Sequence, residues 1–563
     1  MKDCIVLLHG EDISAAQQMA RDLPGAEVCV FDPVLMDRAR AAGFKQVRLL
    51  PYLNAPTYAD LHERSHAAAA ALERQLNALV ATVNGAVSIE GWQHLTLYYL
   101  YMSLGWYAGL AASLVPQLKG RKLHVLVCDN PASYYFNAFV PALLVLQQAQ
   151  AQGIEAAAYN YGSKAEPSRL LPLLSGSPRA FGAEFLLTHL PTCFYDIRYF
   201  NDELKASGKR IVNLEAKHFG VPVAAGESIA LAEPEALANA IAPGWLAEVE
   251  RIETALAQQL HMAFADKIPS PRYRARQVDL LVAGYRSQWL SLRLLERHFA
   301  AAPPSKLLLS DHDTGLHGPL LAFAKAHHLP VLLLPHSKTT PDSEFSCPNM
   351  VALVHPIQGE HIRDGQGKRI LHHPLALPID FSASNRFPTP LRRVALMLNA
   401  YSLGGIYFAP YRSYLDGIAR IAEWCREQDI TLDIRCKPSY SLIHLLASEL
   451  GQDAASLTEN ASVTMAEFAA RCDLCLMYDT PTAGALEFLN QGIAILNPLF
   501  TPPTQPQRVT THPDVVPRES IEQTLQRLHG FVTDPVLLQQ FRWQQFQRYV
   551  QLFDQAQPLR VYL

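Results

Sequence analysis

The chain has 563 residues, of which 49% are hydrophobic and 18% are charged, and this balance excludes a disordered protein. Its 48 basic and 52 acidic side chains leave a formal net charge of −4, which gives no support to a nucleic-acid-binding surface. A chain of this length exceeds one compact core, so we expect two or three domains. The nine cysteines, scattered and odd in number, favour reduced thiols and a cytoplasmic protein over a disulfide framework.

Two segments bear on targeting. The N-terminal MKDCIVLLHGED does not have the pattern of a signal peptide, because its apolar run is too short. Residues 95–115 (LTLYYLYMSLGWYAGLAASLV) carry no formal charge and are long enough to span a bilayer. Their four tyrosines, two serines, threonine and two glycines favour a buried helix instead. The alternative is an apolar surface that makes peripheral contact with the inner membrane or with a partner.

Ten short aliphatic runs occur along the chain, each followed by an amphipathic stretch. This pattern is typical of parallel sheets that are covered by helices on both faces. We therefore predict an α/β protein with two or three Rossmann-like domains. In chain order the runs are CIVLLHG, AEVCVFD, KLHVLVCD, IEAAAYNYG, KLLLSDHD, PVLLLPHS, RRVALMLNA, TLDIRCKP, DLCLMYD and GIAILNP.

Polar residues at the ends of these runs are the first candidates for a site. In parallel sheets of this kind, ligands bind beyond the carboxyl ends of the strands. Seven polar residues fall at or just after such ends: His9, Asp129, Asp311, His336, Asn399, Lys437 and Asp479.

Two segments suggest domain boundaries. The stretch FSASNRFPTPL at 381–391 is rich in Ser, Asn and Pro, and a fresh series of strands and helices follows it. A second division is expected near LKGRK at 118–122. These divisions predict an N-terminal α/β subdomain at 1–120, a Rossmann-like domain at 121–380, another at 381–540 and a C-terminal helix at 541–563.

The sequence SDHD at 310–313 stops an aliphatic run abruptly and allows three interpretations. Asp311 and Asp313 could hold a divalent metal ion, since carboxylates are its usual ligands. Either carboxylate, or the imidazole of His312, could act as a general base. The third interpretation is helix capping, but the helix predicted to begin at Gly318 lies five residues beyond Asp313, so capping explains the carboxylates poorly.

The C-terminal half contains a cationic strand end that suits a phosphate. Lys437 ends the run TLDIRC and is followed by Ser439 and Ser441. A lysine supplies a point charge and the hydroxyls supply hydrogen-bond donors. The alternative is a surface lysine beside a helix-capping serine.

Two further loops of this half could approach a nucleotide or a sugar. Asp479, Thr480 and Thr482 precede a predicted helix that contains Glu487, and hydroxyls at a helix start either bind an anion or cap the helix. Glu487 could accept hydrogen bonds from a ribose or a sugar. The other loop holds Asn399, Gly404 and Gly405, where glycines would let the backbone approach a diphosphate. Neither G-x-G-x-x-G nor a P-loop sequence occurs, which disfavours a classical NAD site and a P-loop enzyme.

The order of these motifs resembles the donor half of GT-B glycosyltransferases. It is most similar to the bacterial surface-polysaccharide, sialyltransferase-like and CDP-glycerol-transferase-like families, over residues 305–540. Lys437-Pro438-Ser439 stands where these families often have Lys-x-His-Pro, and Thr480 and Thr482 stand for an adjacent hydroxyl pair. The resemblance implies that 381–540 binds a nucleotide sugar through the loops named above, with Glu487 on the sugar or ribose.

The same families often carry an acidic general base before a glycine in the N-terminal half. SDHDTG resembles that motif with His312 interposed. The resemblance favours Asp313 or Asp311 as the base, with His312 as competitor, and it disfavours a metal site because GT-B enzymes generally work without one. It also implies that residues 121–380 form the acceptor side, where His336 and, from the first predicted strand, His9 would line the cleft.

The sequence therefore predicts a bacterial-type cytoplasmic glycosyltransferase with a GT-B architecture and a role in polysaccharide biosynthesis. It would move a sugar from a nucleotide-sugar donor, with a CMP-linked acidic sugar among the candidates, to a glycan, lipid-linked or protein acceptor. We expect inversion, no metal and no cofactor. The alternatives are a nucleotide-sugar 2-epimerase or glycerophosphotransferase of the same fold, and a catalytically silent GT-B-like protein that binds glycans or scaffolds an assembly.

Overall fold

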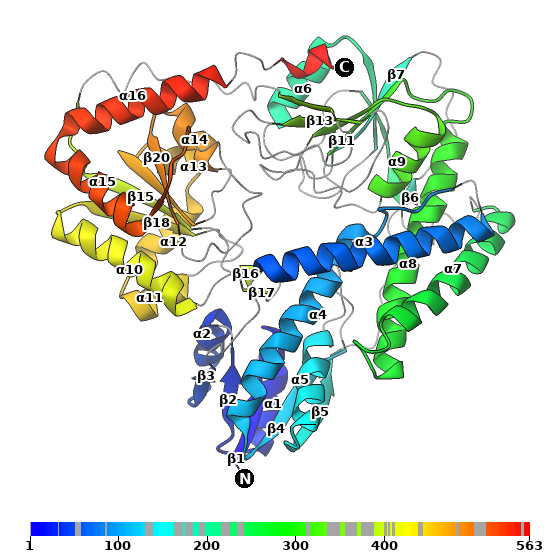
Figure 1. Ribbon diagram of the computed structural model, residues 1–563, viewed down its shortest axis with the longest axis horizontal. Helices are drawn as coiled ribbons and strands as arrows, with labels where there is room; N and C mark the ends of the chain where they lie inside the picture. The colour runs from blue at the N-terminus through cyan, green and yellow to red at the C-terminus, as the bar shows by residue number, and fades with distance from the viewer. Residues whose placement is uncertain are drawn as a thin grey trace.

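The protein, seen in a computed structural model, has three parallel β-sheets with helices packed around them (Figure 1), which confirms the predicted α/β class. All ten predicted aliphatic runs contain a strand. The structure describes residues 2–31, 33–50, 58–84, 87–129, 139–162, 173–174, 184–190, 197–214, 226–232, 241–310, 316–334, 350–354, 369–372, 388–398, 402–403, 406–407, 411–436, 443–479, 484–499, 514–552 and 557–563.

The first sheet is built from the N-terminal part of the chain. Its strands lie in the order β3-β2-β1-β4-β5 and all its pairs are parallel. The strands are β1 (Lys2–Val6), β2 (Glu27–Val30), β3 (Val47–Leu49), β4 (Arg121–Cys128) and β5 (Ala156–Tyr161). Helices α1 (Asp12–Asp22), α2 (Pro33–Ala41) and α5 (Val140–Ala151) belong to the same unit.

A long helical connection separates β3 from β4. It consists of α3 (Tyr58–Val83), α4 (His94–Leu114) and the short 3-10 helix η1 (Val115–Leu118). Because β4 then pairs with β1, with Lys2 opposite Arg121, the division predicted near residue 120 runs through the first sheet instead of between two units. The crossover returns the chain to the sheet that it had left.

Helix α4 corresponds to the uncharged segment 95–115, and it is a core helix, as predicted. It packs against α3 and α5, and its only fully exposed positions are Ala108 and Ala112. Two alanine methyl groups offer little apolar surface to a membrane. Among the helices that the structure describes, none is both long enough and apolar enough to cross a bilayer.

The second sheet has seven parallel strands in the order β14-β13-β12-β11-β7-β8-β9. They are β7 (Phe185–His189), β8 (Arg210–Leu214), β9 (Glu227–Ile229), β11 (Lys306–Ser310), β12 (Val331–Leu334), β13 (Met350–Val354) and β14 (Arg369–His372). The unit also contains α6 (Ile197–Ala206), α9 (His317–Ala326), the packed pair α7 (Pro243–Ala263) and α8 (Pro271–His298), and a small ladder of β6 (Leu173–Leu174) with β10 (Leu231–Ala232).

The third sheet follows in the C-terminal part, with strands in the order β18-β15-β19-β20-β21. They are β15 (Arg393–Leu398), β18 (Thr431–Cys436), β19 (Leu474–Tyr478), β20 (Ala494–Leu499) and β21 (Arg518–Ser520), and β16 (Ser402–Leu403) pairs with β17 (Ile406–Tyr407). Its helices are α10 (Tyr411–Glu427), α11 (Ile443–Leu450), α12 (Ala454–Ser462), α13 (Met465–Ala469), α14 (Gly484–Asn490) and α15 (Ile521–Thr533).

Both faces of the central strands are buried. In β11, Leu307 and Leu309 join one hydrophobic cluster while Leu308 joins another. In β15, Leu396 belongs to the first of these clusters and Ala395 to the second. Strands covered on both faces read as continuous apolar runs, which is why the sequence pattern located them.

The end of the chain returns from the third sheet to the second. Helix α16 (Pro535–Gln551) runs along the third unit, and the C-terminal 3-10 helix η5 (Leu559–Val561) then packs on α6 (Figure 1). The backbone N–H of Arg560 donates to Glu203 at 3.0 Å, and its guanidinium donates to the same carboxylate at 3.3 Å. Lys306 of β11 donates to the Leu563 carbonyl at 3.1 Å. These contacts tie the two C-terminal sheets together.

A close contact inside the third unit gives a test of this packing. A Cβ added at Gly417 of α10 would lie 2.1 Å from the hydroxyl oxygen of Tyr478, which is fully buried and donates to the Tyr414 carbonyl at 3.0 Å. We predict that Gly417→Ala lowers the free energy of unfolding by about 1–3 kcal/mol, because the ring has no space to move into. Chemical denaturation would measure this.

The matched control is Gly530→Ala in α15, where the nearest atom to an added Cβ, on Leu537, lies at 3.8 Å. Alanine favours a helix over glycine, so this variant should be more stable by up to about 1 kcal/mol. Equal destabilisation by the two substitutions would contradict the packing described for Gly417.

Candidate functional site

Each of the three sheets has a topological switch point, where the connections that leave two adjacent strands run in opposite directions. Counted in chain order, the first sheet reads 3-2-1-4-5, the second 3-2-1-4-5-6-7 and the third 2-1-3-4-5. Ligands of doubly wound sheets bind at the carboxyl ends of the strands beside such a point. The adjacent strands are β1 and β4 in the first sheet, β7 and β11 in the second, and β15 and β19 in the third.

Most of the predicted site residues lie outside the described part of the chain. These are Asp311, His312, Asp313, His336, Asn399, Gly404, Gly405, Lys437, Ser439, Ser441, Thr480 and Thr482. Several come directly after the last residue of a described strand: Asp311 follows β11, Asn399 follows β15 and Lys437 follows β18. Of the predicted residues, the structure describes His9, Asp129, Asp479 and Glu487.

At the third sheet, the carboxyl end of β19 is held rigidly at Asp479. This residue is 4% exposed and has a φ of 59°, a left-handed conformation that Asp tolerates better than most residues. Its N–H donates to the Pro498 carbonyl at 2.8 Å, and its own carbonyl accepts from the side-chain amide of Asn497 at 3.0 Å. Asn497 is fully buried, so the end of β19 at Asp479 is held by the neighbouring strand β20.

Two other side chains of this unit, those of Glu487 and Arg518, are relevant to the carboxyl edge of the third sheet. Glu487 lies half-buried in the first turn of α14, and its carboxylate accepts from the Gln491 side chain at 3.5 Å. Arg518 of β21, which the sequence analysis missed, is electrostatically coupled to Asp479: burial lowers the pKa of Arg518, and the negative charge of Asp479 opposes that shift. Arg518 therefore adds positive charge near the carboxyl end of β19. Nothing in the sequence pattern indicated Arg518, because it lies in a strand of only three residues.

At the second sheet, β7 ends in His189 beside β11. Leu309 of β11 is opposite His189, so this imidazole lies one residue back from the strand end that leads into SDHD. His189 is 4% exposed, and burial lowers its pKa to about 4, against the effect of a hydrogen bond to the backbone of Leu214. The adjacent Thr188 is hydrogen-bonded to Asn213 of β8. A buried imidazole with a lowered pKa thus lies next to the carboxyl end of β11.

Helix α9, which follows that loop, is anchored by a glycine. A Cβ added at Gly318 would lie 2.7 Å from the indole ring of Trp92, so the ring packs directly on the α9 backbone. The next residue, Gln93, donates through its side chain to Gln288 of α8 at 2.6 Å. The segment before α4 is therefore wedged between α8 and the start of α9.

A buried polar network joins α3 to α4 next to this wedge. His94 Nδ1 lies 3.0 Å from the carboxylate of Glu73, and His94 Nε2 lies 3.1 Å from His66 Nδ1. His62 Nδ1 lies 2.7 Å from the hydroxyl of Tyr98, whose ring stacks on His66 at 4.1 Å between centroids. If His94 donates to Glu73 from Nδ1, its Nε2 can accept from His66, so the three side chains form one hydrogen-bonded chain.

The sequence carried a signal for this network. His62 and His66 are four residues apart, as are His94 and Tyr98, and residues at this spacing share one face of a helix. The pairing of the two helices could not be read from that spacing. Among the described residues, no group of three or more His, Cys, Asp or Glu side chains is arranged to hold a metal ion.

At the first sheet, the loop after β1 is shaped by Asp12. Its fully buried carboxylate accepts from the backbone N–H groups of Leu8 and His9 at 2.7 and 2.8 Å and from the hydroxyl of Tyr161. Burial raises the pKa of Asp12, and these hydrogen bonds oppose the shift. His9 itself is half-buried, and its ring lies edge-on to Tyr107 at 6.5 Å. His9 thus lies at the switch point of the first sheet, in a different unit from Asp479 and Glu487.

The strand beside it, β4, leads into an ion pair that the sequence analysis missed. Asp129 accepts from Arg276 of α8 through its side chain and through its carbonyl, the latter at 3.3 Å. The guanidinium also lies 5.0 Å from the centre of the Phe139 ring. Asp129 is 4% exposed, so the pair neutralises a buried charge and fastens α8 to the edge of the first sheet.

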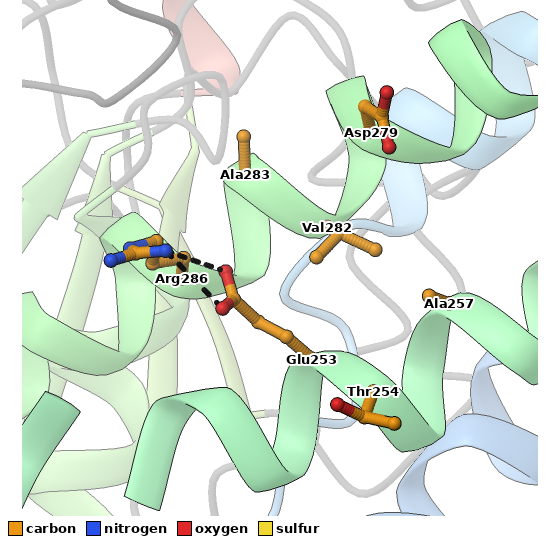
Figure 2. Close-up of a pocket in the computed structure, with 7 residues that line it drawn as sticks. All are labelled: Glu253, Thr254, Ala257, Asp279, Val282, Ala283 and Arg286. Atoms are coloured by element: carbon orange, nitrogen blue, oxygen red, sulfur yellow. Dashed lines mark hydrogen bonds and ion pairs between the residues drawn. The ribbon is translucent and has the colours of Figure 1, made fainter. Parts of the chain in front are cut away.

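A shallow groove on the surface lies apart from these strand ends. Figure 2 shows it between α7 and α8, with Arg286 donating to both carboxylate oxygens of Glu253 at 3.3 and 3.4 Å. The groove has a volume of about 460 Å³, and its described lining residues all come from the two helices. None of the described strand ends contributes to it.

Comparisons with known proteins give similarities to solved structures. No family model matches the chain, and neither does any curated protein. Similar structures include the glycosyltransferase SnogD from Streptomyces nogalater, with 13% identity, a TM-score of 0.35, and coverage of 67% of this chain and 97% of that one. Another is the UDP-forming α,α-trehalose-phosphate synthase from Burkholderia vietnamiensis, with 10% identity, a TM-score of 0.35, and coverage of 66% and 94%.

A third is the glycosyltransferase VinC in complex with dTDP, with 12% identity, a TM-score of 0.31, and coverage of 66% and 96%. At these identities and TM-scores, the similarities carry no conclusion about the activity or the substrates of this chain.

The lowered pKa of His189, beside the switch point of the second sheet, predicts how the free energy of unfolding depends on pH. The folded value of about 4 lies below the value of roughly 6.5 expected in an unfolded chain, so the folded state binds fewer protons. The stability that this residue contributes is therefore complete above about pH 6.5 and is lost as the pH falls toward 4. Between pH 7 and pH 5 the loss amounts to about 2 kcal/mol.

We predict that His189→Gln makes the free energy of unfolding less dependent on pH over this interval by about that amount, as measured by urea denaturation at pH 7 and pH 5. His327→Gln, which replaces an exposed histidine at the end of α9, is the matched control and should leave the dependence unchanged. Identical pH dependence in the wild type and His189→Gln would show that His189 is not held neutral by burial.

Proposed function

We propose that the protein is a GT-B-type glycosyltransferase that binds a nucleotide-sugar donor at the carboxyl edge of the third sheet and an acceptor at that of the second. The observation that carries the proposal is a coincidence of topology and sequence. Two of the three donor-like motifs follow β15 and β19, which are the two strands beside the switch point of the third sheet, and the motif at Lys437 follows β18, the neighbour of β15. The base-like motif follows β11, one of the two strands beside the switch point of the second.

The return of the chain end supports the same architecture. A transferase that holds its donor and acceptor on two separate sheets needs those sheets to keep a defined position relative to each other. The contacts of Arg560 with Glu203, and of Lys306 with the C-terminal carbonyls, provide a tie between the two units. This tie fits the C-terminal helix expected of a GT-B architecture.

The donor would be held by charge and by hydroxyl groups. Lys437 would place its ammonium group on the donor phosphate, and Ser439 and Thr480 would add hydrogen bonds. The half-buried carboxylate of Glu487 would accept from a ribose or sugar hydroxyl. A nearby guanidinium, that of Arg518, makes the β19 end less negative than Asp479 alone would make it. We propose five further donor-binding residues: Asn399, Gly404, Gly405, Ser441 and Thr482.

On the acceptor side, Asp313 or Asp311 would take the proton from the attacking hydroxyl, with His312 as the competing base. A side-chain base opposite the leaving phosphate gives inversion at the sugar carbon. Positive groups on the phosphate would take the place of a metal ion. Because its pKa is lowered to about 4, the buried His189 adds no positive charge near the carboxyl end of β11 at neutral pH.

The finer parts of the proposal follow from the motif resemblance. The donor would be a nucleotide sugar, with a CMP-linked acidic sugar among the candidates, and the acceptor a glycan, lipid-linked or protein substrate. The reaction would belong to polysaccharide biosynthesis in a bacterial cytoplasm, at the inner membrane if the acceptor is lipid-linked.

A thermal-shift screen with CMP, UDP, GDP, dTDP and CDP tests the donor site. We predict that one nucleotide raises the melting temperature, since a ligand at about 100 times its Kd stabilises the fold by roughly 2.7 kcal/mol. Lys437→Ala should abolish this shift. The absence of a shift with every nucleotide would remove the main support for the proposed function.

Asp313→Asn is the matched control, because Asp313 follows the second sheet and not the third. This variant should keep the nucleotide-induced shift and lose sugar transfer by about 10²–10⁴-fold, the usual contribution of a general base. Unchanged transfer in both Asp313→Asn and Asp311→Asn would exclude these carboxylates as the base.

A further inference from the structure

An apolar hollow opens between α4, α5 and the segment that joins α7 to α8. Its volume is about 390 Å³, which lies within the range of small-molecule pockets. Leu104 of α4 and Leu143, Leu144 and Leu146 of α5 contribute to its walls. We call it the α5 hollow. Among the described residues, its lining contains none from the strand ends of the three sheets.

The leucines that line the α5 hollow exceed what α5 needs in order to fold. The helix buries its core side through Val140, Ala142, Val145 and Ala149. A helix on a sheet needs only one apolar stripe, with polar residues on the rest of its surface. Leu143, Leu144 and Leu146 instead extend the apolar surface beyond that stripe and stay half-buried. Water in the hollow would therefore contact hydrocarbon that no packing interaction covers completely.

A cation stands at the rim of this hollow. Lys267 lines it from the α7–α8 segment, is exposed, and has its ammonium group 5.4 Å from the centre of the Tyr101 ring. No ion pair in the described part of the chain involves Lys267, whereas Arg276, Arg286 and Arg293 of α8 each pair with a carboxylate. Gln147 and Ser270 add hydrogen-bonding groups to the lining.

We propose that the α5 hollow binds a single-chain anionic amphiphile. Its aliphatic chain would lie against Leu104, Leu143, Leu144 and Leu146, and its phosphate or carboxylate head would lie at Lys267. Removal of both the chain and the exposed leucine surface from water would drive binding, and the unpaired lysine would select an anionic head. The volume suits one chain and not a bilayer surface. The proposed site does not depend on the glycosyltransferase proposal, because its described lining residues belong to α4, α5 and the segment between α7 and α8.

Isothermal titration calorimetry with dodecyl phosphate, below its micelle concentration, tests the site on the full chain. We expect binding with a stoichiometry of one, weaker binding of dodecyl maltoside, and no detectable heat from inorganic phosphate. Leu144→Gln should weaken dodecyl phosphate at least tenfold. Lys267→Gln should weaken it about two- to fivefold, the scale of an exposed charge contact, and should remove the preference over the maltoside.

Matched controls lie on other elements. Leu537→Gln on α16 replaces a leucine that is 43% exposed, and Lys205→Gln on α6 replaces an exposed lysine; both should leave binding unchanged. The melting temperature of each variant checks that it folds. Absence of binding to the wild type, or binding that neither Leu144→Gln nor Lys267→Gln weakens, would overturn the proposal.

A second experiment distinguishes binding of a single amphiphile molecule from binding of the protein to a membrane surface. In co-sedimentation with phosphatidylcholine vesicles containing phosphatidylglycerol, the protein should stay in solution while it still binds dodecyl phosphate. Sedimentation that is equal for the wild type and Leu144→Gln, together with equal dodecyl phosphate binding, would point to a membrane-binding surface elsewhere and would also overturn the proposal.

Discussion

Burial of parallel strands on both faces is the constraint on which the rest of this structure depends. Helices cover the two faces of each large sheet, so the strand interiors must be apolar and polar side chains gather at the strand ends. The alternation of Leu307, Leu308 and Leu309 between two hydrophobic clusters shows this directly. Because all strands of a sheet point the same way, their polar ends collect along one edge. That edge is where a ligand can meet several loops at once.

The three edges are not equivalent in their chemistry. At the first, the carboxylate of Asp12 is used to hold the β1 loop, and that of Asp129 is neutralised by Arg276. Both carboxylates therefore serve to stabilise the fold. At the second and third edges, the described contacts fix the strand ends themselves, through His189 and Asp479, and leave the chemistry to the loops that follow. This contrast is why the proposed reaction is assigned to the second and third sheets.

The sequence predicted the strands well because double-sided burial leaves a continuous apolar run. It predicted the strand-end residues for the same reason. It did not predict that β4 pairs with β1, since the 58–118 connection is helical and nothing local indicates which sheet the chain rejoins. His189 escaped notice because FLLTH is a short run that ends in polar residues, although it is a buried central strand.

Contacts across long sequence separations account for the remaining differences. Arg276 meets Asp129 across 147 residues, and Gln93 meets Gln288 across 195. The Glu73–His94–His66 chain requires α3 and α4 to pack in one particular register. Helical spacing identified which residues share a face, but the partner of each face follows from tertiary packing. Such contacts position the candidate site and cannot be derived from periodicity alone.

Hydrogen–deuterium exchange with and without the stabilising nucleotide tests the central claim, that the donor binds at the switch point of the third sheet. Donor binding at this edge should slow exchange in peptides that contain residues 399–405, 437–442 and 480–483, which follow β15, β18 and β19. Peptides around His9 and Asp129, at the edge of the first sheet, should exchange as before. Protection confined to the first sheet, with none after β15, β18 and β19, would contradict the account.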